Sequence, residues 1–269
     1  MVGRASMALM VVSFLISAGA PCGLLVYFYK REKMSLIPLV TGIAVFIVFT
    51  QMLEKALHVY LLQLNPRSAQ LFRNPWLFAA YGGLAAGLFE EGGRFVGFNY
   101  LLKRSRKWID GISYGIGHGG AESFLIGGLA NLQYLLFAVL INNGVLEAVL
   151  GGKLPPAPLA QLKQTLVASS PLLFLASGIE RLFALAIQIA LSLVVLYAVR
   201  YGRYIYLLCA VLIHALLDFP AALYQAHRFN LWGVEVFAAL LAVLSVMFII
   251  RSKALFPAEG LKPPQTEAS

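Results

Sequence analysis

Residues 75–102 read PWLFAAYGGLAAGLFEEGGRFVGFNYLL, and their only charged side chains are Glu90, Glu91 and Arg94. A segment of this length and composition is typical of a membrane-spanning helix. The three charged groups would then lie near the middle of the membrane, where an ionised side chain costs about 2.5–3.5 kcal/mol. Ionisable groups at that depth usually mark a functional site, so this stretch predicts both the fold and the position of the chemistry.

A purely structural explanation of these charges is an ion pair within the helix. Arg94 follows Glu90 by four residues and Glu91 by three, and both spacings bring side chains together on a helix surface. One guanidinium cannot neutralise two carboxylates, however, and further polar groups share the same predicted depth. We therefore favour a functional site over a packing contact.

The composition defines the class of protein. Hydrophobic residues make up 60% of the chain and charged residues only 12%, which excludes a soluble globular domain. The net charge is +9, but Lys and Arg lie mostly between apolar blocks, so they indicate orientation in a lipid bilayer and no nucleic-acid binding. Cys22 and Cys209 have no CxxC or Cys/His spacing, so we expect neither a disulfide framework nor a thiolate metal site.

The apolar blocks predict an all-α protein, a polytopic transmembrane helical bundle with about seven crossings. A single integral-membrane domain, residues 1–250, is expected to precede a polar cytoplasmic tail, residues 251–269, with loops at 65–74 and 142–170. Basic residues gather at alternate ends of the crossings. The positive-inside rule therefore places the N-terminus outside the cell membrane and the C-terminus in the cytoplasm. The predicted crossings are 7–29, 36–64, 75–102, 109–141, 171–199, 204–225 and 231–250.

The fourth segment, residues 109–141, is too long for a straight crossing. At 1.5 Å per residue it would extend roughly 50 Å, against a hydrocarbon core of about 30 Å. It is therefore expected to be bent, broken or partly re-entrant. Gly127 and Gly128 are the predicted position, because glycine in a helix interior costs roughly 1 kcal/mol relative to alanine.

Two His/acid pairs occur with i, i+4 spacing on other crossings: His118 with Glu122, and His214 with Asp218. Counting from the basic residues at the predicted cytoplasmic ends places both histidines and the acidic pair about 15 Å deep. Neutral imidazole and carboxylate are good ligands for a divalent metal such as zinc, with a neighbouring glutamate taking a proton from bound water. The same groups could also activate water directly, without a metal.

Two further polar pairs are interpreted as structural. Glu54 and His58 have the same i, i+4 spacing but lie nearer the outer end of their crossing, so they are expected to pack or to support the site indirectly. Glu180 and Arg181 are expected to pair with polar groups on other helices, because charges within membrane spans seldom stay unpaired.

The motifs EEGGR, GIGHGGAES and HALLD, in this order on separate predicted crossings, resemble those of the YhfC-type intramembrane metalloproteases. That group is related to the CAAX-processing and bacteriocin-processing membrane proteases, whose motifs are EExxxR, FxxxH and HxxxN/D. The resemblance covers residues 75–224. Two departures are visible: Arg94 follows the second glutamate by three residues instead of four, and Tyr114 stands before His118 where the broader group has phenylalanine.

The resemblance implies roles for the residues of these motifs. Glu90, with Glu91, would activate water, and the other site positions would be His118, His214 and Asp218. It also implies a histidine downstream of the Glu-Arg pair, where this chain has Gln188. If that position were a metal ligand, this protein would bind metal less well or be inactive.

The leading hypothesis is therefore an intramembrane protease, either a metallopeptidase or a glutamate-type peptidase, acting on a membrane-embedded or membrane-proximal peptide. One alternative is a proton- or cation-coupled transporter, in which the buried carboxylates form a relay. Another is a catalytically impaired pseudoprotease that binds membrane segments without cutting them. The candidate catalytic residues are Glu90, Glu91, Arg94, Glu122 and Asp218, the candidate metal ligands are His118 and His214, and the candidate cofactor is zinc.

Overall fold

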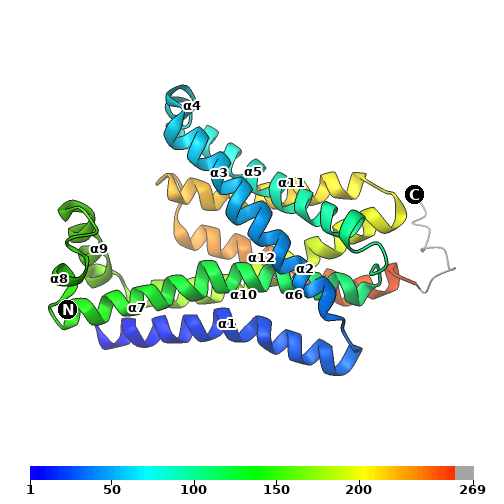
Figure 1. The fold of residues 1–269 in the computed structure, drawn as a ribbon, viewed down its shortest axis with the longest axis horizontal. Helices are drawn as coiled ribbons and strands as arrows, with labels where there is room; N and C mark the ends of the chain where they lie inside the picture. The colour runs from blue at the N-terminus through cyan, green and yellow to red at the C-terminus, as the bar shows by residue number, and fades with distance from the viewer. Residues whose placement is uncertain (258–269) are drawn as a thin grey trace. The chain divides into compact units, whose positions relative to one another are not determined.

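The computed structural model describes residues 1–257, and every regular element in that part of the chain is helical (Figure 1). A helix of membrane length, α5 (Pro75–Val96), carries Glu90, Glu91 and Arg94, which reduce its apolar character. Six other segments are long and apolar enough to cross a membrane: Arg4–Glu32, Leu36–Leu64, Trp108–Asn142, Pro171–Tyr201, Ile205–Gln225 and Leu231–Leu255. The prediction of an all-α bundle with about seven crossings is confirmed.

The membrane-length segments contain several short π-helical stretches. The second segment consists of α2 (Leu36–Val45), η1 (Phe46–Glu54), α3 (Lys55–Val59) and η2 (Tyr60–Leu64). The third is α5 followed by η3 (Gly97–Leu101). The remaining long helices are α1 (Arg4–Glu32), α10 (Pro171–Tyr201), α11 (Ile205–Gln225) and α12 (Leu231–Ser252), the last followed by the 3₁₀ turn η5 (Lys253–Leu255).

The long fourth segment is deformed where its glycine pair predicted a weak point. α6 (Trp108–Glu122) gives way to the π-helical η4 (Ser123–Gly128), which ends at Gly127 and Gly128. α-Helical bonding resumes in α7 (Leu129–Asn142). The segment is thus locally irregular rather than interrupted, because the wider π turn keeps its backbone groups hydrogen-bonded inside an apolar span.

Two predicted loops contain short helices, which corrects the sequence-based expectation. Residues 65–74 include α4 (Pro66–Leu71), where Asn65 Oδ1 accepts hydrogen bonds from two backbone N–H groups of the first turn and Pro66 occupies the first helical position. Residues 142–170 include α8 (Leu146–Leu150) and α9 (Pro156–Ala168). The prolines that start α4 and α9 lie in their first turns, where proline is well tolerated. The predicted tail beyond Pro257, residues 258–269, lies outside the described residues.

The chain divides into two compact units. The first comprises Met1–Cys22 and Glu122–Leu182. Small hydroxyl side chains join its helices: Ser13 Oγ donates to the carbonyl of Phe174 at 2.5 Å, and Ser123 Oγ donates to that of Ser17 at 2.9 Å. The second unit comprises Gly23–Ala121 and the described residues from Phe183 onwards. It contains the acidic pair, His118 and His214, so the site can be described within this unit alone.

Helices α5 and α11 of the second unit run side by side (Figure 1), and glycines allow their close approach. A Cβ atom at Gly87 would lie 2.6 Å from the carbonyl oxygen of Val211, and one at Gly83 would clash with that of Ala215. Real Cβ atoms do not approach backbone oxygens so closely. The glycines thus let the backbone of α5 lie directly against α11, as small residues do in membrane helix pairs.

We expect Gly87→Ala to destabilise the protein by about 1–3 kcal/mol, the usual range for overpacking, because the new methyl group meets backbone rather than a mobile side chain. Gly92→Ala is the matched control on the same helix, since a Cβ there has no neighbour within 4 Å. That change should be neutral or stabilise by up to roughly 1 kcal/mol through helix propensity. Thermal unfolding in detergent micelles measures both. Equal effects of the two substitutions would show that the close α5–α11 contact is absent.

Candidate active site

The centre of the predicted site is the carboxylate of Glu90, on α5. Its Oε2 atom lies 2.9 Å from His118 Nε2 of α6 and 3.0 Å from Gln188 Nε2 of α10. The Nη2 group of Arg94 is 3.4 Å away. Glu90 is 5% exposed, so its carboxylate lies almost entirely out of contact with solvent. Three helices therefore direct hydrogen-bond donors at one carboxylate oxygen.

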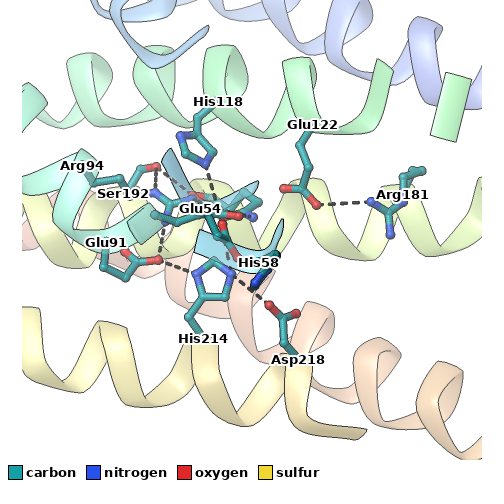
Figure 2. Close-up of polar contacts among 12 residues, drawn as sticks. Glu54, His58, Glu91, Arg94, His118, Glu122, Arg181, Ser192, His214 and Asp218 are labelled. Atoms are coloured by element: carbon teal, nitrogen blue, oxygen red, sulfur yellow. Dashed lines mark hydrogen bonds and ion pairs between the residues drawn. The ribbon is translucent and has the colours of Figure 1, made fainter. Parts of the chain in front are cut away.

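Glu91, the neighbouring carboxylate, is fully buried and faces α11. Its Oε1 atom lies 2.6 Å from His214 Nδ1 and also accepts a hydrogen bond from Arg94 Nη1. The other ring nitrogen, His214 Nε2, lies 3.8 Å from Glu90 Oε2 and 3.6 Å from Asp218 Oδ2. Figure 2 shows His214 between Glu91 and Asp218. The arrangement is a carboxylate–imidazole pair whose second nitrogen points toward the other two acids.

Arg94 ties the two carboxylates together. Its guanidinium is fully buried and contacts both Glu90 and Glu91, while its Nε donates to Ser192 Oγ at 3.3 Å. Its Nη2 also donates to the side-chain oxygen of Gln188. Arg94 therefore forms an ion pair with both acids, as the purely structural explanation of these charges expects. One positive charge still faces two carboxylates, and the two imidazoles supply the remaining stabilisation through hydrogen bonds.

The hydrogen-bond pattern assigns the imidazole tautomers. His118 Nε2 faces a carboxylate, while its Nδ1 is buried with no partner among the described residues. The proton is therefore assigned to Nε2, which donates to Glu90. His214 Nδ1 faces Glu91 in the same way, which leaves His214 Nε2 able to accept a proton. In each histidine the nitrogen that faces a glutamate carries the proton. The other nitrogen is the buried Nδ1 in His118 and Nε2 in His214.

Packing fixes the position of His118. Flanking glycines bring α6 close to its neighbours: a Cβ at Gly119 would lie 2.8 Å from Gln188 Cβ, and one at Gly117 would clash with the carbonyl of Leu39. The ring of Phe46 meets the imidazole edge-on, with ring centroids 5.2 Å apart. His118 is fully buried as a result. The glycine-rich motif GIGHGG therefore serves to seat one imidazole against Glu90.

The candidate site residues belong to both compact units. Glu90, Glu91, Arg94, His118 and His214 form one contact network, with Asp218 at its edge, and we call these six residues with Gln188 and Ser192 the Glu/His cluster. Glu122 begins the second stretch of the other compact unit, where Arg181 Nη1 lies 3.2 Å from its Oε1. An ion pair at that position is sufficient to account for a carboxylate in an apolar span. Its assignment as catalytic stays a prediction.

Two members of the cluster were not found by spacing. Gln188 was noted only through the family resemblance, and Ser192 was missed. Both are buried on α10, and Ser192 Oγ donates to the Gln188 carbonyl at 2.7 Å. Their i, i+4 spacing within the apolar segment 171–199 is the signal that could have found them, because polar side chains so placed share one helical face.

Glu54 and His58 form a separate contact. His58 Nε2 lies 3.3 Å from Glu54 Oε1, and His58 Nδ1 lies 2.6 Å from the hydroxyl of Tyr81. This network joins the second segment to α5. It agrees with a packing role, and an indirect role in supporting the site stays a prediction.

The donor types of the cluster fit a zinc site, but their arrangement does not. An ion shared by His118 and His214 would bind their Nε2 atoms. Both of these atoms already face Glu90 Oε2. The Arg94 guanidinium, in contact with both carboxylates, would place a positive charge beside any such ion. Within residues 1–257, no group of three or more His, Cys, Asp or Glu side chains is arranged to hold a metal. The prediction of His118 and His214 as metal ligands is therefore not supported by the geometry.

The fold and the cluster together define a polytopic helical membrane protein with a buried glutamate, arginine and histidine site built from α5, α6, α10 and α11. Residues 12–238 match the YhfC intramembrane metalloprotease family, and the chain belongs to that family. It is also similar to the uncharacterized membrane protein YhfC of Bacillus subtilis (strain 168), with 38% identity over 257 residues that cover 95% of this chain and 100% of that protein. No solved structure matches the chain. The family resemblance drawn from the three motifs is confirmed.

Proposed function

We propose that the protein hydrolyses a peptide bond within or at the membrane, with Glu90 as the general base. One observation carries this assignment: all the hydrogen bonds and ion pairs of Glu90 within residues 1–257 go to Oε2. Oε1 is left to accept a proton from water. Glu91 is a poorer candidate, because it is fully buried and its Oε1 is held by both Arg94 and His214.

The proposed reaction needs only groups of this chain. Water gives a proton to Glu90 Oε1 as its oxygen attacks the peptide carbonyl carbon, and a tetrahedral intermediate forms. The carbon–nitrogen bond then breaks, and the proton held by Glu90 passes to the leaving nitrogen, directly or through His214 Nε2. The products are a carboxylic acid and an amine. A site with almost no solvent strengthens each of these electrostatic contacts.

The remaining residues of the cluster act on the two groups that move protons. Arg94 and Gln188 hold the Glu90 carboxylate, and Glu91 orients the His214 ring by accepting from Nδ1. Asp218 has the most exposed side chain of the group, at 36%. We infer that a membrane-embedded or membrane-proximal peptide reaches the site beside Asp218. The proposed orientation has the N-terminus outside the cell membrane and the C-terminus in the cytoplasm.

We expect this peptidase activity to persist without a metal, because no step above uses one. The purified full chain, reconstituted in liposomes with a panel of single-span peptides, should cut at least one of them after dialysis against a strong zinc chelator. Mass spectrometry identifies the cut, and elemental analysis should find metal well below one ion per chain. Stoichiometric zinc, with activity lost on chelation and restored by zinc alone, would refute the metal-free mechanism. Binding of peptides without any cleavage would instead favour the pseudoprotease.

A further inference from the structure

A second polar site lies in the same unit, at the ends of several membrane-length helices. It is a cavity of about 730 Å³, a size in the normal range for small-molecule sites. It lies where α1 and α12 end and where α6 begins. Its lining residues are Glu32, Lys103, Arg104, Arg106, Lys107, Trp108, Ile109, Arg200, Lys253, Phe256 and Pro257. We call it the basic pocket.

The basic pocket has a large excess of positive charge. Six of its lining side chains are cationic and only Glu32 is acidic. Glu32 is already paired, since Lys253 Nζ lies 2.9 and 3.0 Å from its two oxygens. Lys103 and Arg104 are exposed and have no acidic partner among the described residues. The pocket therefore attracts anions and has no carboxylate of its own left to neutralise them.

Two of the arginines are held in place by backbone carbonyls, which orient a guanidinium without cancelling its charge. Arg200 donates to the carbonyls of Arg106 at 3.0 Å and Pro257 at 2.6 Å. Arg106 donates through Nη2 to the carbonyl of Phe98 at 3.3 Å. Its Nε is buried and has no acceptor within residues 1–257. A buried donor left unsatisfied in a cationic pocket points to an anionic acceptor, because such a group costs about 1–3 kcal/mol when it stays unpaired.

Two further features suit a phosphate group at a membrane surface. The N-terminus of α6 at Trp108 adds the partial positive charge of a helix start to the pocket wall. Trp108 and Phe256 supply aromatic surface, with Lys253 Nζ lying 5.1 Å from the centre of the Trp108 ring. Aromatic side chains are typical of the level at which headgroups meet the hydrocarbon core. Basic pockets between membrane helices bind anionic lipid headgroups for these reasons.

We propose that the basic pocket binds the phosphate-bearing headgroup of an anionic phospholipid. The site shares no lining residue with the Glu/His cluster, and the proposal does not depend on proteolysis. Phosphate oxygens would accept from the arginines, including Arg106 Nε, and the acyl chains would continue into the bilayer along the helices. The pocket thereby fixes the depth of the loop 102–107 at the membrane surface.

The test is a titration of the full-length protein in neutral detergent with short-chain phosphatidylglycerol, followed by its thermal stability. Wild-type protein should be stabilised by phosphatidylglycerol, and phosphatidylcholine should have a much smaller effect because its headgroup has no net charge. Lys103→Gln/Arg104→Gln should weaken the affinity roughly 30-fold, since each cation near an anionic surface contributes a factor of roughly five. The matched control is Arg67→Gln/Arg73→Gln, which removes the same charge from exposed positions outside the pocket.

Three results would overturn the proposal. Equal weakening by the pocket variant and the control would mean that net charge alone attracts the lipid. Inorganic phosphate that stabilises the protein as well as the lipid does would assign the pocket to a free anion. Tighter lipid binding by a chain ending at Pro257 would mean that the segment with Glu259 and Glu267 competes for the pocket and that an internal carboxylate is its native occupant. These experiments measure lipid binding and not peptide cleavage. Failure of the proposed peptidase activity would therefore leave the lipid site unaffected.

Discussion

Replacing Glu90 with glutamine is expected to lower the rate of peptide cleavage by about 10²–10⁴, the usual contribution of a general base. The amide keeps the shape of the side chain, and its oxygen can still accept hydrogen bonds from His118 and Gln188 at the Oε2 position. It cannot take a proton from water. The fold should therefore persist while the chemistry stops. Cleavage of a single-span peptide in liposomes measures the rate, and thermal unfolding confirms that the variant is folded.

Glu54→Gln is the matched control for that experiment. Glu54 is also a buried carboxylate of the second unit in contact with a histidine, but that histidine is His58, which lies outside the Glu/His cluster. The rate of peptide cleavage by Glu54→Gln should remain within a few-fold of wild type. Full cleavage activity in Glu90→Gln, or equal losses in both variants, would remove Glu90 from the role of base.

Arg94→Gln is expected to reduce the free energy of unfolding by about 3–5 kcal/mol, the range for breaking a buried ion pair by removing one partner. The substitution leaves Glu90 and Glu91 side by side in a buried site without the guanidinium that pairs with both. It also removes the donors to Ser192 and Gln188. Denaturant unfolding in detergent micelles provides the measurement.

A double-mutant cycle separates lost charge pairing from lost packing. Glu91→Gln/Arg94→Gln removes both partners of a fully buried ion pair, so it should be less destabilising than the sum of the single changes. The expected coupling is at least about 1 kcal/mol, since contacting residues in one network couple by 0.5–3 kcal/mol. Strict additivity would show that Arg94 stabilises the fold by filling space and not by pairing with Glu91.

The metal question also depends on Arg94. A divalent ion and a buried guanidinium compete for the same carboxylates, because both are stabilised by the same negative charge. The family's description implies a metal, whereas the contacts of this chain give both glutamates to Arg94. The chelation experiment and the Glu90→Gln variant are complementary. The first asks whether a metal is needed, and the second asks whether a protein carboxylate is the base in either case.

The sequence by itself determined the class of fold and the charged and histidine residues of the site. Long apolar segments are local features, and a bilayer permits them only as helices whose backbone groups are all bonded. Charged side chains within such a segment are costly wherever the helix packs, so Glu90, Glu91 and Arg94 stood out without any tertiary information. The i, i+4 spacings of the two histidines followed from helix geometry alone. Residue counts from the basic ends gave their common depth, and the contacts of His118 and His214 with the acidic pair agree with it.

Only the tertiary structure decided which groups meet. Whether a carboxylate faces an imidazole or an arginine depends on the rotation of each helix about its axis, and that rotation is set by contacts between distant segments. Gly87 and Gly119 fix two of those contacts through close backbone or side-chain approach. The same packing brought Gln188 into the cluster and gave Glu122 to Arg181 in the other unit. His118–Glu122 and His214–Asp218 have the same spacing along the chain, so the sequence predicts the same role for both acids. Their contacts differ, because the partner of a side chain depends on which helix face packs against it: Glu122 pairs with Arg181, and Asp218 lies near His214.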